Sequence, residues 1–454
     1  MNRYRLRANY EICNIASKRE DGTIIVDIPM LSENEIKYGL NRVKEKLYKE
    51  NIYPTEVGFD IMSLATMVYL ADTRIERVVH GQDSWSREIE LEIPVSNVEL
   101  WKTQIHTVER MLKFLTGDLW KIILSSRTWQ FCNSDEIGEK TNKYDKVSLF
   151  SGGMDSLIST INLMEDKKNT LLVSHSGEGL TKNAQKNIVD RFDLLYSDVL
   201  HTWLNLWMVF PKDYIPEGGN DNNTRSRSFL FIGYAIFAMS GMGNIKELLV
   251  PENGLIALNV PLDETRVGSF STRTTHPFYI HLWNDLLRGL GLGISIKNPY
   301  WNKTKGEMAA ECKNKDVLYE TMKLSFSCSS PGKGRWKNLS PQHCGYCVPC
   351  LIRRAAMYKA FGQDATVYTE KSIHKMQNKN SEGMGIQLRS FQYAIDKIKQ
   401  DSKRALFYIH KPGPLPHDDN EYLQELANVY MRGLMEVDEF IQNDLAKEDS
   451  NNDL

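Results

Sequence analysis

The sequence lacks a long hydrophobic run, an excess of charge of either sign, and a high cysteine content. Its longest apolar stretch, Phe229–Met239, is about half the length that a helix needs to cross a bilayer, so we expect no membrane association. The 56 lysines and arginines nearly balance 58 acidic residues, and the formal net charge of −2 argues against a protein that coats nucleic acid. Seven cysteines in 454 residues are too few for a disulfide scaffold.

The chain also lacks the marks of export and of internal repetition. The first residues, Met-Asn-Arg-Tyr-Arg-Leu-Arg, are not followed by an apolar segment, so we expect no signal peptide and a soluble, cytoplasmic protein. We find no repeat and no low-complexity tract in the sequence. A length of 454 residues is about three times that of an ordinary domain and predicts two or three domains.

The two ends of the chain differ from its middle. Residues 1–143 combine an alternating strand at Glu88–Val95 with a helix at about Phe59–Val79 and a capping box at Ser32–Glu35 that predicts another helix start. This mixture predicts an α+β domain. Residues 364–454 carry apolar residues at helical spacing and are predicted to form a helical C-terminal region.

Residues 144–363 alternate short β-type runs with helical stretches. The five runs are Val147–Phe150, Thr170–Ser174, Leu206–Phe210, Glu247–Val250 and Ile294–Lys297. This alternation predicts an α/β domain with a doubly wound parallel sheet. Since ligands of such sheets bind at the carboxyl ends of the strands, we expect the functional residues directly after each strand.

A glycine-rich loop follows the first of these strands. Ser151-Gly152-Gly153-Met154-Asp155-Ser156 opens a helix, so backbone N–H groups and the positive helix end can bind an anion. The serine hydroxyls can donate to phosphate oxygens, and Asp155 can reach a magnesium ion. A plain turn with two glycines is the alternative interpretation, but this six-residue string directly after a strand favours phosphate binding. No Walker motif and no GxGxxG after a strand is present.

In this string the chain resembles the PP-loop ATP pyrophosphatase family, whose adenine nucleotide alpha hydrolase-like fold carries an SGGxDS loop. The resemblance implies that Ser151, Gly152, Gly153, Met154, Asp155 and Ser156 bind ATP, together with Mg²⁺. It also implies cleavage of ATP between the α and β phosphates and an adenylated intermediate, with Asp155 and Ser156 in the catalytic set.

Four of the seven cysteines lie close together in the sequence. Cys328, Cys344, Cys347 and Cys350 have the spacing C-x15-C-x2-C-x2-C, which suits a tetrahedral Zn²⁺ ion. Four protein ligands leave no open coordination position, so we expect a structural zinc site within a loop. His343 can replace one cysteine, and an iron–sulfur cluster is the less favoured occupant.

The loop and the cysteines together resemble the 7-cyano-7-deazaguanine synthase (QueC) family. Arg353 and Arg354 follow the last cysteine, Arg227 opens a helix, and Thr304–Glu307 matches the family's Thr-Lys-x-Glu helix start. The additional N-terminal domain resembles the QueC-like proteins of Qat anti-phage defence operons (QatC). The resemblance covers about half of the chain, and the strings Pro251–Gly254 and Arg273–Pro277 replace the family's acidic string after the fourth strand.

This resemblance implies an ATP-dependent C–N ligase that adenylates the carboxylate of 7-carboxy-7-deazaguanine and passes the acyl group to an amine. Cations at helix starts or after strands are the candidates for stabilising charge on phosphate and carboxylate. We expect these to be Arg227 and Lys305 in catalysis, and the substrate to contact Glu252, Asn253, Arg273 and His276. Each of these side chains alone has a solvated-surface or local-cap alternative.

Three alternatives remain open from the sequence. The deazaguanine can be joined to an amine of a partner protein instead of becoming a nitrile, a PP-loop tRNA-modifying sulfur transferase also combines this loop with cysteines, and a binding module can keep the fold without catalysis. Residues 1–143 have no catalytic spacing, so we expect them to bind a partner protein from the same defence operon. We expect no direct binding of nucleic acid.

Overall fold

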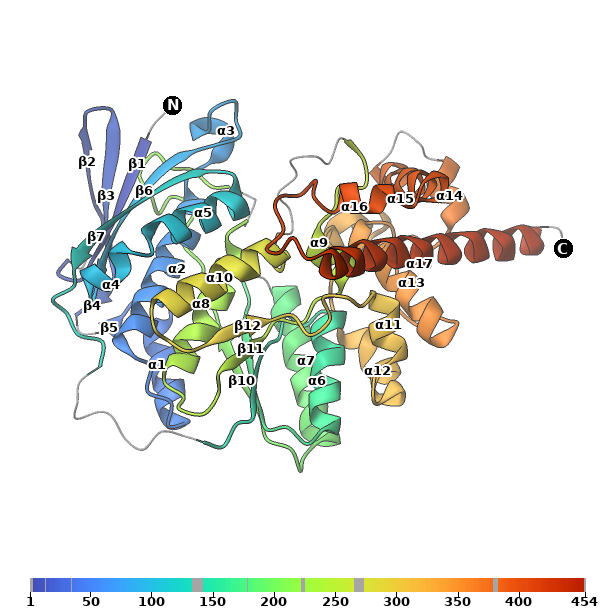
Figure 1. Cartoon of the computed structure of the whole chain (residues 1–454), viewed down its shortest axis with the longest axis horizontal. Coiled ribbons are helices and arrows are strands. Elements are labelled where there is room, and N and C mark those ends of the chain that lie inside the picture. The colour runs from blue at the N-terminus through green and yellow to red at the C-terminus, as the bar shows by residue number, and fades with distance from the viewer. Residues whose placement is uncertain are drawn as a thin grey trace.

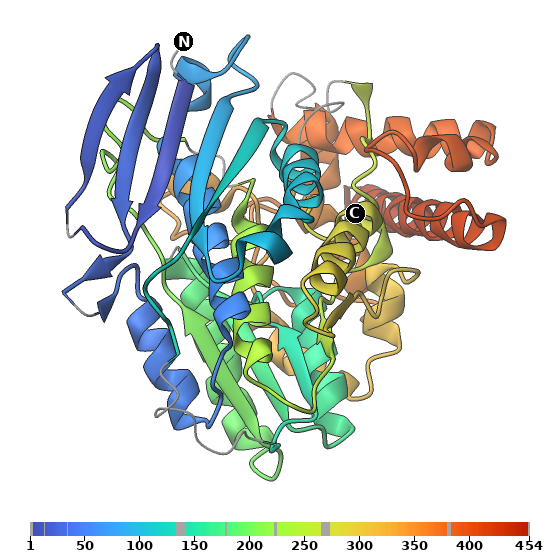
Figure 2. The ribbon, with the colours of Figure 1, turned by 60° about the vertical axis from the view of Figure 1, so that its left-hand side comes forward.

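Two five-stranded sheets organise the N-terminal two thirds of the chain. The computed structural model describes residues 3–452 except 13, 34, 133–141, 178, 222–224, 265–272 and 379–382. The first sheet has the order β2-β3-β1-β6-β7, and its strands are β1 (Arg3–Asn9), β2 (Ala16–Glu20), β3 (Thr23–Pro29), β6 (Glu88–Val95) and β7 (Leu119–Ser126). Figure 2 shows this sheet at the upper left and the second sheet below it.

The first sheet corrects the expected α+β arrangement of residues 1–143. All neighbouring strands are parallel except the edge strand β2, which pairs antiparallel with β3. Helices lie between β3 and β6 and between β6 and β7, namely α1 (Leu40–Lys49), α2 (Glu56–Arg74), α3 (Arg77–His80), α4 (Val98–Lys102) and α5 (Ile105–Thr116). The region is therefore α/β with a mixed sheet, since helical crossovers return the chain in the same direction.

The prediction that a helix starts at Ser32 is also wrong. The segment forms a small antiparallel hairpin of β4 (Leu31–Ser32) and β5 (Glu35–Ile36), and Asn34 of the expected capping box lies outside the described residues. The helix α1 begins at Leu40, because Gly39 has a φ of 79° and turns the chain into it. The apolar residues at helical spacing that matched the expectation, Val43 and Leu47, lie on the buried face of α1.

The second sheet confirms the expected parallel α/β architecture. Its order is β10-β9-β8-β11-β12, and every pair is parallel. The strands are β8 (Lys146–Leu149), β9 (Thr170–His175), β10 (His201–Leu206), β11 (Glu247–Leu249) and β12 (Ser295–Lys297). The strand order reverses beside β8, so the crevice between the carboxyl ends of β8 and β11 is the switch point where such sheets bind ligands.

The strand β10 ends where the sequence pattern placed its start. The run Leu206–Phe210 alternates between buried and exposed residues, but after Leu206 it leaves the sheet. Alternation marks a half-buried extended segment, whether or not it has a hydrogen-bonded neighbour. The pattern therefore identified the extended segment and missed its pairing.

Helices cover both faces of the second sheet. α6 (Met154–Glu165) and α7 (Gly179–Leu195) contribute to the core on one face, and α8 (Arg227–Ser240) and α10 (Pro277–Gly289) to the core on the other. α8 also packs against α2, which covers the first sheet, so the two sheets and two helices form successive layers (Figure 1). The hydrophobic core of the first sheet is continuous with that of the second through this helix pair.

Small residues allow α2 and α8 to approach closely. A Cβ atom added at Gly233 of α8 would lie 2.9 Å from Cβ of Ala65 in α2. A Cβ atom at Gly58 of α2 would lie 2.1 Å from Oγ of Ser240 in α8. Since real Cβ atoms do not make such contacts, glycine at these positions sets the distance between the helices.

The C-terminal part is helical and has a core of its own. It contains α13 (Val348–Phe361), α14 (Ile373–Asn378), α15 (Gly383–Gln400), α16 (Arg404–Tyr408) and α17 (Asn420–Asn452). These helices pack with the short helix α9 (Gly254–Leu258), while α11 (Lys305–Ala310), α12 (Lys315–Thr321) and two 3₁₀ turns, Met322–Leu324 and Pro331–Lys337, connect the sheet to them. α17 extends away from the sheets at the right of Figure 1. None of the helices described is both long and apolar enough to cross a membrane.

Candidate active site and metal centre

The glycine-rich loop links β8 to α6 at the switch point. Gly152 has a φ of 79°, which favours glycine, and Gly153 is the N-cap residue of α6 without a capping side chain. Ser151 Oγ accepts a hydrogen bond from Gly153 N at 3.2 Å and lies 3.1 Å from Ser156 Oγ. The side chain of Met154 is buried in the core, so this residue offers only its backbone to a ligand.

Asp155 is the residue at which the expected site comes together. Its Oδ1 atom lies 2.8 Å from Nζ of Lys305, the first residue of α11, and both side chains are 9% exposed. Its Oδ2 atom accepts hydrogen bonds from the backbone N–H of Asn253 at 3.1 Å and from Nδ2 of Asn253 at 2.8 Å. Residues from three distant parts of the sequence therefore meet between the ends of β8 and β11.

Asn253 holds this arrangement from the side of β11. Besides donating to Asp155, it caps α9, because its Oδ1 atom accepts from Ile256 N at 3.2 Å. The residue is completely buried. Its place in the structure is therefore that of a positioning residue for Asp155, and the sequence expectation of a direct substrate contact finds no support in its hydrogen bonds.

Glu252 is a carboxyl group with a perturbed pKa beside this ion pair. Burial raises its pKa from the ordinary value of 4.5 to about 7, and the negative charge of Asp155 adds to the rise. The hydroxyls of Thr275 and Thr274 donate to Oε2 and oppose the rise in part, as does the charge of Lys305. A carboxyl group with a pKa near neutrality can exchange a proton at physiological pH.

A cavity of about 490 Å³, which we call the Glu252 pocket, opens beside these groups. Its polar wall contains the side chains of Glu252, Arg273, Lys305 and Ser327. Its apolar wall comes from α9, α13 and α15 and includes Leu255, Ile256, Val348, Ile352 and Phe391. Cavities of this size with an apolar lining and a few convergent polar groups are typical of small-molecule sites.

Arg273 reaches the Glu252 pocket from the segment before α10. Its guanidinium donates to the carbonyl oxygen of Phe114 at 2.9 Å and lies 4.7 Å from the centre of the Phe114 ring. Burial, together with the nearby charge of Arg225, lowers its pKa to about 10. The group remains a cation at neutral pH, so it brings positive charge to the pocket as expected.

Two expected site residues lie apart from the pocket. His276 is fully buried and caps α10, because its Nδ1 atom accepts from Phe278 N at 3.2 Å, and burial lowers its pKa to about 3. Arg227 opens α8 and donates to the carbonyl oxygen of His175 at the end of β9, at 3.3 Å. In the described structure neither residue lines the Glu252 pocket. For His276 the local-cap alternative from the sequence fits the geometry.

Four cysteines lie close enough together to bind a metal ion such as zinc. The Sγ atoms of Cys328, Cys344, Cys347 and Cys350 all lie within 4.8 Å of one another. The pairs Cys328–Cys347 and Cys344–Cys350 are each 3.9 Å apart. A tetrahedral ion with Zn–S bonds of about 2.3 Å separates its sulfurs by about 3.8 Å, so the geometry fits zinc.

Backbone donors and a histidine surround the cysteines. Ser330 N and Cys344 N donate to Sγ of Cys328 at 3.3 and 3.2 Å, and such donors favour the thiolate form that binds a metal. His343 Nε2 lies 3.2 Å from the carbonyl oxygen of Ser325, and its Nδ1 atom is 3.8 Å from Cys350 Sγ. The cluster therefore consists of the four cysteine sulfurs, and His343 lies next to it without replacing a cysteine.

The cysteine cluster and the glycine-rich loop are neighbours. Phe326, two residues before Cys328, donates its N–H to the carbonyl oxygen of Gly152 at 2.8 Å. Arg353 is completely buried in α13 and donates to Ser325 Oγ at 2.8 Å. The segment before the first cysteine is thus fixed between α13 and the loop, so the cysteine cluster lies beside one wall of the candidate active site.

Sequence reasoning missed several residues of the pocket. Thr275, between Arg273 and His276, was not among the expected site residues, although its hydroxyl donates a hydrogen bond to Oε2 of Glu252. Ser327 could have been predicted, because it directly precedes Cys328 of the cysteine cluster. Phe391 and Gln387 come from α15, and nothing in their local sequence connects them with the loop.

No protein-family model matches the chain, and no curated protein is detectably similar to it. The function is therefore inferred from the chemistry of the residues at the site.

Proposed function

We propose that the protein is an ATP-dependent C–N ligase of the PP-loop type that adenylates the carboxylate of 7-carboxy-7-deazaguanine and transfers the acyl group to an amine. The single observation that carries the proposal is the Asp155–Lys305 ion pair, 2.8 Å long, beside a glycine-rich helix start and at the edge of the Glu252 pocket. We propose further that the protein is a QueC-like member of an anti-phage defence operon and uses Asp155 and Lys305 in this adenylation.

The loop and its neighbours are suited to the phosphates of ATP. The uncapped N–H groups at the start of α6 and the hydroxyls of Ser151 and Ser156 are donors, and Lys305 supplies a positive charge. Asp155 is the carboxylate that suits Mg²⁺, which proteins bind through one or two carboxylates plus substrate phosphates. The ion would neutralise part of the phosphate charge.

The proposed reaction has two steps. A carboxylate oxygen of the deazaguanine bonds to the α phosphorus of ATP, the α–β bond breaks, and pyrophosphate leaves. The amine nitrogen then bonds to the acyl carbon, AMP leaves, and the amine loses a proton. Glu252, whose pKa is raised to about 7 by burial, lies at the pocket wall and suits the role of proton acceptor.

The acceptor amine defines two versions of the proposal. With ammonia the product is an amide, and a second activation by ATP dehydrates it to the nitrile. With an amine of a partner protein the product is a protein conjugate, and residues 1–143 are the proposed partner-binding part. Mass spectrometry of reactions with ATP, 7-carboxy-7-deazaguanine and candidate partner separates the two, because only conjugation changes the mass of the partner.

The decisive experiment measures AMP and pyrophosphate release with and without 7-carboxy-7-deazaguanine. We expect release that depends on the deazaguanine, and loss of release in the variants Asp155→Ala and Lys305→Ala. Lys303→Ala is the matched control, because Lys303 lies two residues away and pairs with exposed Glu311 at 2.9 Å. ADP and phosphate as first products would contradict adenylation, and AMP release without the deazaguanine would favour another PP-loop reaction, such as sulfur transfer to tRNA.

A further inference from the structure

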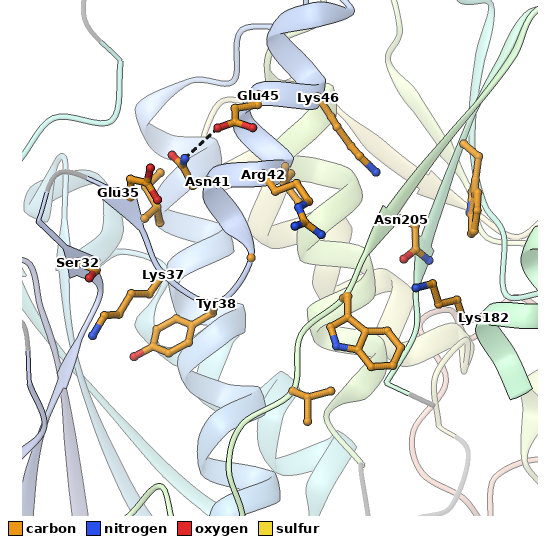
Figure 3. Close-up of a pocket in the computed structure, with 16 residues that line it drawn as sticks. Ser32, Glu35, Lys37, Tyr38, Asn41, Arg42, Glu45, Lys46, Lys182 and Asn205 are labelled. Atoms are coloured by element: carbon orange, nitrogen blue, oxygen red, sulfur yellow. Dashed lines mark hydrogen bonds between the residues drawn. The ribbon is translucent and has the colours of Figure 1, made fainter. Parts of the chain in front are cut away.

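A second, larger cavity lies beside β10, the edge strand of the second sheet, and is separate from the Glu252 pocket. It has a volume of about 790 Å³, and we call it the α1–β10 pocket, because α1 with the preceding hairpin forms one wall and the edge strand β10 with its extension forms the other (Figure 3). The residues that line it and those that line the Glu252 pocket are different. None of the functional residues expected from the sequence belongs to it.

Four cations line this pocket, namely Lys37, Arg42, Lys46 and Lys182, and the last three lie close to one another. Arg42 and Lys46 lie one helical turn apart on α1, and Lys182 comes from α7 on the opposite wall (Figure 3). The pKa of Lys46 is lowered by burial and by the charges of Arg42 and Lys182, so the three groups are close enough to repel one another. Folding brings these cations together from two distant segments of the chain.

Within the described residues Arg42, Lys46 and Lys182 form no ion pair with an acid. Two acids, Glu35 and Glu45, also line the pocket, and Glu45 accepts a hydrogen bond from Asn41 at 3.1 Å. The cluster contrasts with the chain as a whole, whose net charge is −2. A cavity lined by more cations than acids is suited to an anionic ligand.

An exposed tryptophan stands beside the cations. The side chain of Trp207 is 45% exposed, and Nζ of Lys182 lies 5.2 Å from the centre of its ring. Trp203 lines the same wall, and its buried Nε1–H has no partner among the described residues. Aromatic faces next to lysine and arginine are the combination by which proteins bind single-stranded nucleic acid, because bases stack on the rings and phosphates pair with the cations.

We propose that the α1–β10 pocket binds single-stranded nucleic acid, with phosphates at Arg42, Lys46 and Lys182 and a base stacked on Trp207. An acidic peptide would use the cations and leave the indole without a role. The pocket lies beside β10, the edge strand of its sheet. The proposal is independent of the ligase reaction and departs from the expectation based on net charge.

The test is a fluorescence anisotropy titration of a labelled twelve-residue oligothymidylate with the full chain at 50 and 200 mM salt. Three phosphate contacts predict a slope of log K against log salt of about −2. Arg42→Ala, Lys46→Ala and Lys182→Ala should each weaken binding about eightfold at 50 mM salt and make the slope shallower by about 0.7. Trp207→Ala should weaken binding about fivefold or more through lost stacking.

The matched control is Lys49→Ala, which removes the same charge from the same helix outside the pocket. It should change the affinity less than about twofold, since a surface charge away from the ligand is screened. The proposal is overturned if Lys49→Ala weakens binding as much as Lys46→Ala, or if no binding occurs. It is also overturned if AMP or a ten-residue polyglutamate displaces the oligonucleotide at equal concentration. Circular dichroism of each variant verifies that the fold is kept.

Discussion

The raised pKa of Glu252 makes the stability of the protein depend on pH in a way that one substitution can reveal. In the unfolded chain this carboxyl group ionises at about 4.5, whereas in the folded protein its pKa is raised to about 7. The folded state therefore binds a proton more tightly than the unfolded state. Stability from this group is present below pH 4.5 and is lost as the pH rises through 7.

The size of the effect follows from the two pKa values. A rise from 4.5 to about 7 corresponds to about 3 kcal/mol. Because part of the side chain faces the pocket, solvent reduces this figure, and we expect about 1–3 kcal/mol. Glu252→Gln removes the ionisable group and keeps a hydrogen-bond acceptor for Thr275. The free energy of unfolding of the variant, relative to that of the wild type, should therefore be higher at pH 8 than at pH 5 by this amount.

The assay is urea unfolding of the wild type and of Glu252→Gln at both pH values. The cysteine cluster is the same in both proteins, so its own pH dependence cancels in the difference. Glu99→Gln is the control, since the side chain of Glu99 is 81% exposed, and it should shift the unfolding midpoint equally at both pH values. The same stability difference between Glu252→Gln and wild type at pH 5 and pH 8 would refute the reasoning.

Three further predictions concern the ion pair, the metal centre and the layer between the sheets. Removing Lys305 by substitution with Met should destabilise the protein by about 3–5 kcal/mol, because it leaves a buried charge unpaired, and adding Asp155→Asn should restore part of the loss in a double-mutant cycle. Cys347→Ser should reduce bound zinc below one ion per chain by metal analysis and lower the melting temperature, and full zinc content would contradict four-cysteine ligation. Gly233→Val should cost about 1–3 kcal/mol by overpacking against Ala65 in urea unfolding, whereas an unchanged midpoint would mean that the helices can move apart.

The sequence predicted the second sheet and the meeting of its loops for a clear physical reason. Short apolar runs between amphipathic helices form parallel strands, and the ends of parallel strands meet at one edge of the sheet. The residues after β8 and β11, Asp155 and Asn253, are therefore hydrogen-bonded although 98 residues separate them. Lys305 was also expected from the sequence, as a cation at the start of a helix, and this helix follows β12.

The remaining features depend on contacts that local patterns do not contain. The mixed topology of the first sheet depends on which strands pair, and the fully exposed β2 leaves no alternation to identify it as an edge strand. The contribution of Phe391 to the pocket depends on how the C-terminal helices dock. The role of His276 as a buried cap depends on how α10 packs against Phe114. The centres of the His276 and Phe114 rings are 5.1 Å apart.

Besides lining the Glu252 pocket, the C-terminal region supports the candidate site through a buried carboxylate. Glu436 of α17 accepts hydrogen bonds from Thr304 Oγ1 at 2.6 Å and from Gly306 N at 2.8 Å, the residues on either side of Lys305. A Cβ atom at Gly306 would lie 2.5 Å from this carboxylate, so the helix start and α17 fit closely. A negative charge at a helix N-terminus is stabilising, and here it also fixes the helix that carries Lys305. The position of the lysine beside Asp155 therefore depends on a residue more than a hundred positions away, which explains why the α/β sheet and the helical region form one site.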